Sequence, residues 1–417
     1  MMIQRIYNWK NKKKEWNNWK NAAFAGAIFL LPFSFQGFSL ALSLTMFFVL
    51  FEIWQKKEWS LSITLFDGLI LLFLGWSFFV TVISPQSSMG LFIQSGLIPT
   101  CSYFVMSRQI MSKENQRSFL QMIWLGAAFV AVLGLWEIFA GIAQLNKFWV
   151  DLENFSGAMV RMSGPLENPN LMAGYLAIII AFWSGYRSCR PQNRDGVLGI
   201  MGLCLLLVCL FLTYSRGAWI SLFVVLIALG VWHRSKKYLF FGIFSLAVLA
   251  LLSEPLVLER ISSIWSPTSD SSSALRLAIW HSTLYLIVDY PICGIGWGAF
   301  PLVYPLYDYF LIDPKPTIYH AHNLYLHLVA EVGIVGFFIW VGIIFTLVKN
   351  LWNRVSKKEP LALGVICAIS VILLGGLTDD WLFNPKISTF FWILAGLSQC
   401  KVKNIREVSR KKGKNCE

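Results

Sequence analysis

Long apolar runs separated by short polar segments make up most of this 417-residue chain. Residues 22–54 form one such run, and a single helix of that length would extend about 50 Å, well beyond a hydrocarbon core of about 30 Å. Pro32 and the pair Gln36-Gly37 interrupt the run, and lysines flank it at both ends. The run therefore predicts two membrane spans joined by a tight turn, with both outer ends of the pair on the same side.

Residues 197–232 repeat this pattern. The run is again too long for one span, and its only polar point is Tyr214-Ser215-Arg216-Gly217. We therefore predict a second helical hairpin with Arg216 at its turn. Further spans are predicted at residues 65–83, 90–106, 119–143, 171–183, 238–252, 324–347, 361–377 and 387–397.

These runs predict an all-α, polytopic integral membrane protein with about 12 transmembrane helices and a large, partly helical extracytoplasmic loop. Hydrophobic residues account for 56% of the chain and charged residues for only 14%, which supports this class. The predicted organisation is a cytoplasmic basic tail at 1–21, nine spans in 22–252, the large loop at 253–322, three spans in 323–400 and a second cytoplasmic basic tail at 401–417.

The distribution of basic residues orients the spans. Cytoplasmic segments of membrane proteins carry an excess of lysine and arginine. Only seven of the 35 lysines and arginines fall in the predicted outer segments, so both termini are expected in the cytoplasm. This pattern explains the net charge of +13 without a nucleic-acid partner. The seven outer residues are Lys147, Arg161, Arg216, Arg260, Arg276, Lys315 and Lys386.

Two of the outer arginines are candidates for anion binding. Arg216 lies in a hairpin with almost no loop, and Arg276 lies in residues 273–289, which have the pattern of an amphipathic helix. A guanidinium can hold a phosphate through two parallel hydrogen bonds. The alternative for Arg216 is an interfacial anchor or a pair with Asp379 or Asp380.

Three of the five histidines lie between His320 and His327, just before a long apolar span. Asn323 is a suitable N-cap, which places His322 where a helix begins. The positive end of the helix dipole favours a neutral imidazole, the form that accepts a proton from a hydroxyl. His322 is therefore the candidate catalytic residue. The alternative for His327 is a pair with Glu331, four residues further along the same helix.

No metal site or cofactor is predicted. The histidines lack a recognised ligand spacing, and the eight cysteines show no paired metal-ligand pattern. The glycines at 294, 296 and 298 follow no strand, so they predict a tight structural turn rather than a phosphate-binding loop.

Taken together, these segments resemble the O-antigen ligase and O-antigen polymerase superfamily of polytopic membrane glycosyltransferases. The resemblance extends over about residues 160–340. It is carried by Arg161 with Asn168-Pro169-Asn170, by Thr213-Tyr-Ser-Arg216-Gly217, by Asp289-x-Pro-x-x-Gly-x-Gly-x-x-x-Phe300, and by His322-Asn323-x-Tyr325-Leu with Glu331-x-Gly333.

The resemblance implies a metal-independent, inverting glycosyltransferase that moves a glycan from a polyprenyl-diphosphate carrier to a glycan or lipid-linked acceptor hydroxyl. It implies that Arg216 and a loop arginine, Arg276 or Arg260, hold the diphosphate and that His322 assists the acceptor. Weaker candidates for contacts with the glycan or acceptor are Arg161, Asn170, Asn323 and Tyr325.

The implied setting is the outer face of a bacterial cytoplasmic membrane, within envelope polysaccharide assembly and in contact with other assembly proteins. Two alternatives remain open at this point. A secondary transporter of a small anion such as bicarbonate would use the same arginines along a path, and a scaffold in an assembly complex would perform no chemistry. Ligase and polymerase differ only in the acceptor, which the sequence does not name.

Overall fold

The computed structural model describes residues 19–56, 63–109, 113–141, 161–189, 197–234, 271–309 and 318–399. Every regular element within these ranges is a helix, which confirms the all-α prediction. Five of the described helices are long and apolar enough to cross a membrane, and three shorter apolar helices accompany them. The predicted span at 238–252 lies outside the described residues.

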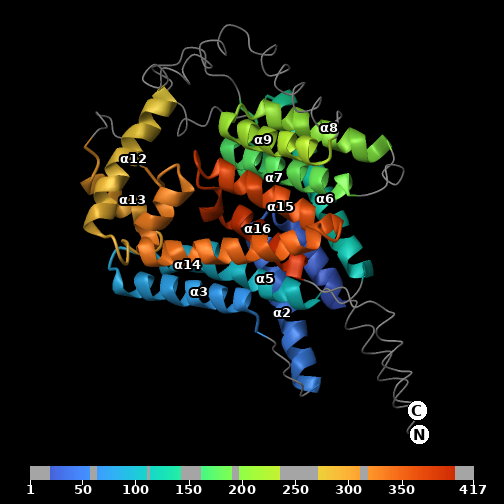
Figure 1. Cartoon of the computed structure of the whole chain (residues 1–417), viewed down its shortest axis with the longest axis horizontal. Coiled ribbons are helices and arrows are strands. Elements are labelled where there is room, and N and C mark those ends of the chain that lie inside the picture. Colours follow the sequence, from blue (N-terminus) through green and yellow to red (C-terminus); the bar gives the residue numbers. More distant parts are fainter. Residues whose placement is uncertain are drawn as a thin grey trace.

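A helix over residues 19–30 precedes the elements labelled in Figure 1. The further helices are α2 (Phe35–Lys56), α3 (Leu65–Ile83), α4 (Met89–Leu91), α5 (Ile98–Gln109), α6 (Lys113–Phe139), α7 (Pro169–Ser188), α8 (Val197–Leu212), α9 (Arg216–Trp232), α12 (Ser271–Asp289), α13 (Phe300–Val303), α14 (Leu324–Val355), α15 (Pro360–Gly375) and α16 (Pro385–Gln399). Short turns are η1 (Phe92–Leu97), a π-helix, and the 3₁₀ helices η2 (Gly164–Leu166), η4 (Tyr304–Leu306) and η5 (Trp381–Phe383).

Both predicted hairpins are present. The first apolar run breaks at residues 31–34, around Pro32, and the Lys20 Nζ lies 2.7 Å from Glu52 Oε2. That ion pair joins the two open ends of the hairpin, which lie on the same side, as expected from the lysines that flank the run. The second run breaks after α8, and α9 begins at Arg216. Tyr214 allows this abrupt turn by adopting a left-handed backbone conformation, with φ of 53°.

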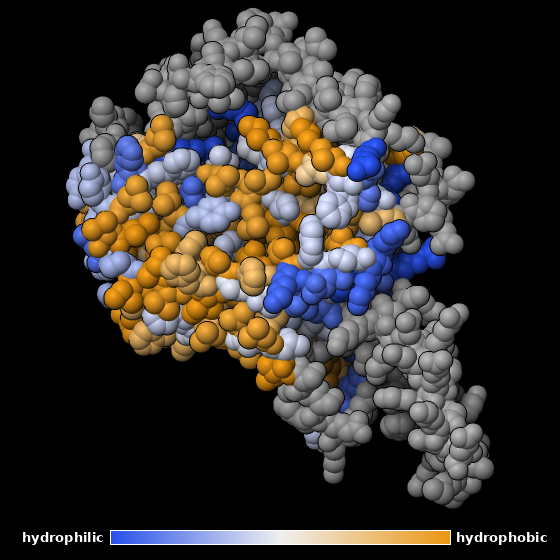
Figure 2. All heavy atoms as spheres, in the orientation of Figure 1, coloured by the Kyte–Doolittle hydropathy of each residue, from blue (hydrophilic) through white to orange (hydrophobic). Residues whose placement is uncertain are grey.

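The helices α7, α15 and α16 form the centre of the molecule, because most of their side chains are buried. Helices α3 and α14 run beside one another along one side, and α12 crosses the direction of α14 at one end (Figure 1). The α12 range confirms a helix over the predicted 273–289, but its apolar side chains are not gathered on one buried face, since Leu284 and Val288 are exposed while Ser282 is buried. Figure 2 shows a broad apolar belt over α3 and α14, as expected of a surface that faces lipid.

The long helix α14 is interrupted in its third turn. Gly333 has φ of 67° and ψ of −179°, so the helix continues only after one residue outside the helical range. A Cβ atom on Gly333 would lie 1.9 Å from the Ile292 carbonyl oxygen. The chain that carries Gly294, Gly296 and Gly298, the glycine-rich segment, therefore approaches α14 very closely. Only glycine combines this backbone conformation with this close approach.

The glycine-rich segment satisfies the backbone groups that this interruption releases. Ile295 N–H donates to Ala330 O, and Gly296 N–H donates to Glu331 O, both at 2.9 Å. The Gly298 N–H donates to the Glu331 carboxylate, also at 2.9 Å. The segment is therefore a structural turn that packs against α14, as predicted, and it is inserted at the end of the bundle that α12 covers (Figure 1).

We predict that Gly333→Ala destabilises the protein severely. The substitution adds backbone strain of about 1–3 kcal/mol, because this combination of φ and ψ is essentially confined to glycine, to a direct clash with Ile292. Gly342→Ala on the same helix is the matched control, because its new Cβ would meet no atom closer than 3.8 Å. Thermal unfolding of the purified proteins in detergent measures both. Equal melting temperatures for the two variants would contradict the described interruption.

The predicted orientation is tested separately by thiol labelling in a background without the eight native cysteines. A cysteine introduced at Ser271, at the start of α12, is expected to react with an impermeant reagent in intact cells. A cysteine at Ser356, at the far end of α14, is expected to react only after the membrane is opened. Labelling of Ser356→Cys in intact cells would contradict the predicted orientation.

Candidate active site

Three helix ends bring the predicted site residues together. Helix α9 begins at Arg216, α14 begins two residues after His322, and α15 ends shortly before Asp379. The Leu324 N–H donates to Gly376 O at 2.8 Å, which joins the start of α14 to the end of α15. A Cβ on Gly217 would lie 2.4 Å from Thr378 Oγ1, so the start of α9 reaches the same place.

His322 stands directly before the predicted helix start. Asn323 caps α14 by accepting from the Tyr325 and Leu326 N–H groups at 3.0 and 3.1 Å, which confirms the predicted cap. His322 has a left-handed backbone with φ of 49°, a conformation that few non-glycine residues adopt. Its Nδ1 lies 3.8 Å from Asp379 Oδ1, and its side chain is 19% exposed.

His320 and His327 complete a cluster with Asp380. The His320 Nδ1 lies 3.0 Å from Asp380 Oδ1, and the rings of His320 and His322 are 4.1 Å apart. The Ala321 N–H donates to His327 Nδ1 at 3.1 Å, so the proton of this imidazole is on Nε2, which faces Glu331 Oε1 at 3.5 Å. The pair predicted between His327 and Glu331 is therefore present.

The two neighbouring aspartates lie in different electrostatic environments. Burial alone raises the pKa of Asp379, but its contact with His322 and the positive charges of His322 and Arg276 outweigh burial, so this pKa lies below the usual range. Burial and the negative charge of Asp379 raise the pKa of Asp380 to about 7, although His327 opposes this shift. Burial and the charge of His322 hold the pKa of His320 well below its usual value. Asp380 therefore holds a proton more readily than Asp379.

The predicted arginines take different places around this cluster. Arg276 lies on α12, and its charge is close enough to lower the pKa of Asp379. Arg216 is the first residue of α9, and its neighbour Gly217 lies against Thr378. The alternative loop arginine, Arg260, lies outside the described residues. The structure thus brings both Arg216 and Arg276 to the end of the bundle that holds His322.

The four weaker candidates make hydrogen bonds within the protein. Arg161 donates from Nε to Thr213 O and from Nη2 to Asn170 Oδ1, each at 2.8 Å. Asn323 Nδ2 donates to Leu377 O at 3.1 Å, and the Tyr325 hydroxyl donates to Leu373 O at 2.7 Å. These bonds fix the start of α14 to the end of α15 and the start of α7 to the turn before α9. The predicted contact with a glycan or acceptor is not tested by them.

One group in the described part of the chain has the geometry to hold a metal ion. His320, His322 and Asp379 each offer one donor atom, and these atoms lie within 4.8 Å of one another. Sequence spacing predicted no metal site, because the third donor comes from a segment more than fifty residues away.

Sequence reasoning treated Asp379 and Asp380 only as possible partners of Arg216. In the structure they face the histidines instead, and both are buried. The sequence feature that could have revealed these site residues was a pair of acidic residues between the last two apolar spans, on the predicted outer side. Burial of two adjacent carboxylates requires partners, and the histidines at 320–327 were candidates on that side beside the arginines.

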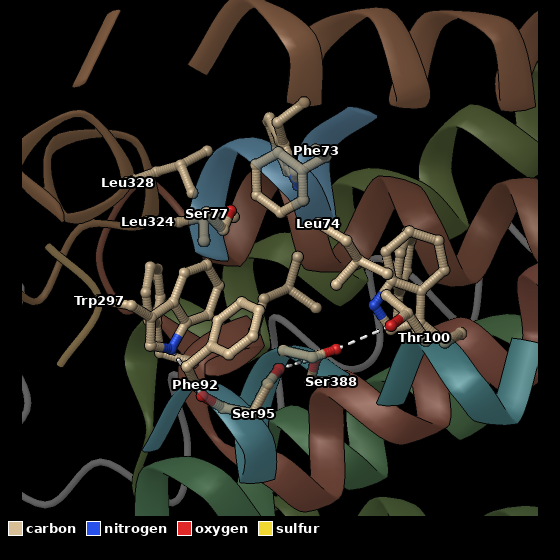
Figure 3. A pocket seen from close by; sticks show the side chains of 16 residues that line it. Phe73, Leu74, Ser77, Phe92, Ser95, Thr100, Trp297, Leu324, Leu328 and Ser388 are labelled. Atoms are coloured by element: carbon tan, nitrogen blue, oxygen red, sulfur yellow. Dashed lines mark hydrogen bonds between the residues drawn. The ribbon is translucent and has the colours of Figure 1, made fainter. Parts of the chain in front are cut away.

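A small, partly open pocket lies beside the first turns of α14 and is lined mostly by apolar side chains (Figure 3). Its volume is about 40 Å³, far below that of typical small-molecule sites. Trp297 Nε1 donates to Ser95 Oγ at 2.9 Å in its wall, and Ser388 Oγ donates to Ser95 O at 3.1 Å. The candidate site is therefore the charged cluster at the helix ends rather than this pocket.

Comparison with known proteins gives matches of one kind. Residues 201–341 match the family model described as O-antigen ligase, a range that includes Arg216, Arg276 and His322. An O-antigen ligase of Pseudomonas aeruginosa is 25% identical over 332 residues, covering 79% of this chain and 73% of the relative.

A Rickettsia conorii protein named "Putative polysaccharide ligase" is 22% identical over 324 residues, covering 67% of this chain and 77% of the relative. A Rickettsia prowazekii protein of the same name is 27% identical over 233 residues, covering 54% of this chain and 53% of the relative. These matches agree with the motifs and with the helical architecture. Residues 201–341 thus match the O-antigen ligase family, and the chain is similar to proteins named as O-antigen and polysaccharide ligases.

Proposed function

We propose that this protein transfers a glycan from a polyprenyl-diphosphate carrier to an acceptor hydroxyl during assembly of cell-envelope polysaccharide. The proposed setting is the outer face of a bacterial cytoplasmic membrane, with both termini in the cytoplasm. The observation that carries the proposal is the placement of His322 next to the buried Asp379, at the end of the bundle that also holds Arg216 and Arg276. The family match and the names of the relatives support it.

The diphosphate of the donor is proposed to bind between Arg216 and Arg276. Arg216 also stands at the N-terminus of α9, where Ser215 makes no side-chain hydrogen bond to the first turn. The backbone N–H groups of that turn can therefore share in binding an anion. At α14, by contrast, Asn323 already satisfies the first turn. This difference favours α9 as the phosphate end of the site.

His322 is proposed to act as the general base. The acceptor hydroxyl oxygen attacks the anomeric carbon and gives its proton to His322, while the bond from that carbon to the diphosphate breaks and its electron pair leaves with the diphosphate. A single displacement of this kind inverts the anomeric configuration. The ionised Asp379 is proposed to orient the His322 ring and stabilise its positive charge after proton transfer.

The transfer step is proposed to need no metal ion. Two guanidiniums can stabilise the negative charge that grows on the leaving diphosphate, which is the task a metal performs in other phosphate chemistry. Asn323 and Tyr325 are proposed to hold the start of α14 in place, so that His322 keeps its position. Arg161 and Asn170 similarly fix the turn that carries Arg216.

Gathering of the charged groups at one end of the helices favours an enzyme over an anion transporter, which needs a path through the membrane. The direct test is to incubate the purified protein with a polyprenyl-diphosphate oligosaccharide and candidate acceptors and to resolve the products by size. A single transfer indicates a ligase, and a ladder of products indicates a polymerase. No transfer to any acceptor, with donor binding intact, would contradict a catalytic role.

We predict that Arg216→Lys inserts and folds normally but binds the donor at least about tenfold more weakly, because lysine cannot form two parallel hydrogen bonds with a phosphate. Arg354→Lys is the matched control, since Arg354 pairs with Glu359 at the far end of α14. Titration with a fluorescent donor measures both variants. Donor binding that is unchanged in Arg216→Lys would make Arg216 a structural anchor.

A further inference from the structure

We propose that His320, His322 and Asp379 form a binding site for a divalent transition-metal cation such as Zn²⁺, and that the bound cation switches off glycan transfer. The binding part of the proposal is independent of the function proposed above. The inhibitory part rests on the proposed role of His322 as base.

The donor atoms are suitable in kind and in number. Two imidazoles and one carboxylate are a ligand set that zinc uses in catalytic sites, with the fourth position left to water or another group. The donor atoms of the three residues lie within 4.8 Å of one another. Donors around a tetrahedral zinc ion are about 3.3 Å apart, so side-chain rotations that close the group by about 1.5 Å would complete the site.

Two buried imidazole nitrogens that complete no hydrogen bond also support a metal site. The Nδ1 atoms of His320 and His322 are both buried, and neither completes a hydrogen bond within the described chain. A buried polar atom without a partner is costly, and groups of this kind often mark an ion or water site. Both atoms face carboxylate oxygens, the Asp380 oxygen at 3.0 Å and the Asp379 oxygen at 3.8 Å.

The surrounding charges also favour a cation. Asp379 and Asp380 are adjacent in sequence and both buried, and their ion-pair partners among the described residues are histidines. A divalent cation held by His320, His322 and Asp379 would compensate the buried Asp379 carboxylate. Arg276 is the group that opposes binding, because its charge also reaches Asp379. Cation and guanidinium therefore compete for this carboxylate.

Capture of the cluster would remove the base from catalysis. A His322 ring that ligates a metal through one nitrogen is held in the metal geometry, and the cation blocks the Asp379 oxygen that orients the ring. The ion would also place its charge near Arg276 and alter the diphosphate position. Without the cation, His322 would act as a base. With the cation bound, all three residues would be metal ligands and His322 could no longer accept a proton.

The binding test uses the full-length protein in detergent, without a polyhistidine tag and after removal of metal with a chelator. Titration with Co²⁺ is expected to give visible absorption bands that saturate at one equivalent and disappear on addition of Zn²⁺. Mg²⁺ is expected to leave the bands unchanged, because it prefers oxygen ligands.

His320→Gln is expected to weaken Co²⁺ binding by more than about tenfold, since even loss of a group outside the ligand shell has an effect of that size. His281→Gln on α12 is the matched control, because this exposed histidine lies outside the cluster. Absence of cobalt bands in the wild type, or equal binding by wild type and His320→Gln, would overturn the site.

The inhibitory part is tested in the transfer assay with Zn²⁺ held at fixed free concentrations by a metal buffer. Wild-type transfer is expected to fall as the site fills and to recover when excess chelator is added, whereas His320→Gln is expected to resist the same Zn²⁺ concentrations. Saturation of the site without any loss of transfer would overturn the inhibition. Because cobalt binding is measured without substrates, its result does not depend on whether the proposed function is correct.

Discussion

The buried carboxylate of Glu331 connects the parts of the molecule on which the site depends. Its Oε1 accepts from the Gly298 and Phe300 N–H groups at 2.9 and 3.4 Å and faces His327 Nε2 at 3.5 Å. One group therefore holds the glycine-rich segment, the interrupted start of α14 and the histidine cluster in one arrangement. A carboxylate at this depth is tolerated only because these partners surround it.

Departures from regular backbone collect around the same end of the bundle. Gly333 interrupts α14, Tyr214 and His322 adopt left-handed conformations, and Phe92–Leu97 form a π-helix beside the small apolar pocket. Each departure has a positional effect: Gly333 admits the glycine-rich segment, Tyr214 turns the chain into Arg216, and His322 directs its ring toward Asp379. Such conformations persist where the surrounding packing enforces them, which is the situation at many functional sites.

The sequence allowed good prediction wherever one physical limit acted on a continuous stretch. The hairpins at Pro32 and Arg216 followed from the thickness of a bilayer, and the cap at Asn323 followed from local hydrogen bonding. Placement of Arg216, Arg276 and His322 at one end followed from the alternation of spans. The meeting of His322 with Asp379 was not predictable in this way, because it depends on how α14 packs against α15. The same is true of the three-residue metal geometry, which spacing along the chain argued against.

In the proposed mechanism the arginines bind the donor, and His322 accepts the proton of the acceptor hydroxyl. The substitution His322→Gln separates these two tasks. Glutamine can keep a hydrogen bond but is a poor proton acceptor. This variant is expected to bind the polyprenyl-diphosphate donor as tightly as the wild type and to transfer the glycan about 10²–10⁴ times more slowly in single-turnover measurements. Transfer within tenfold of the wild-type rate, or loss of donor binding in proportion to rate, would contradict the account.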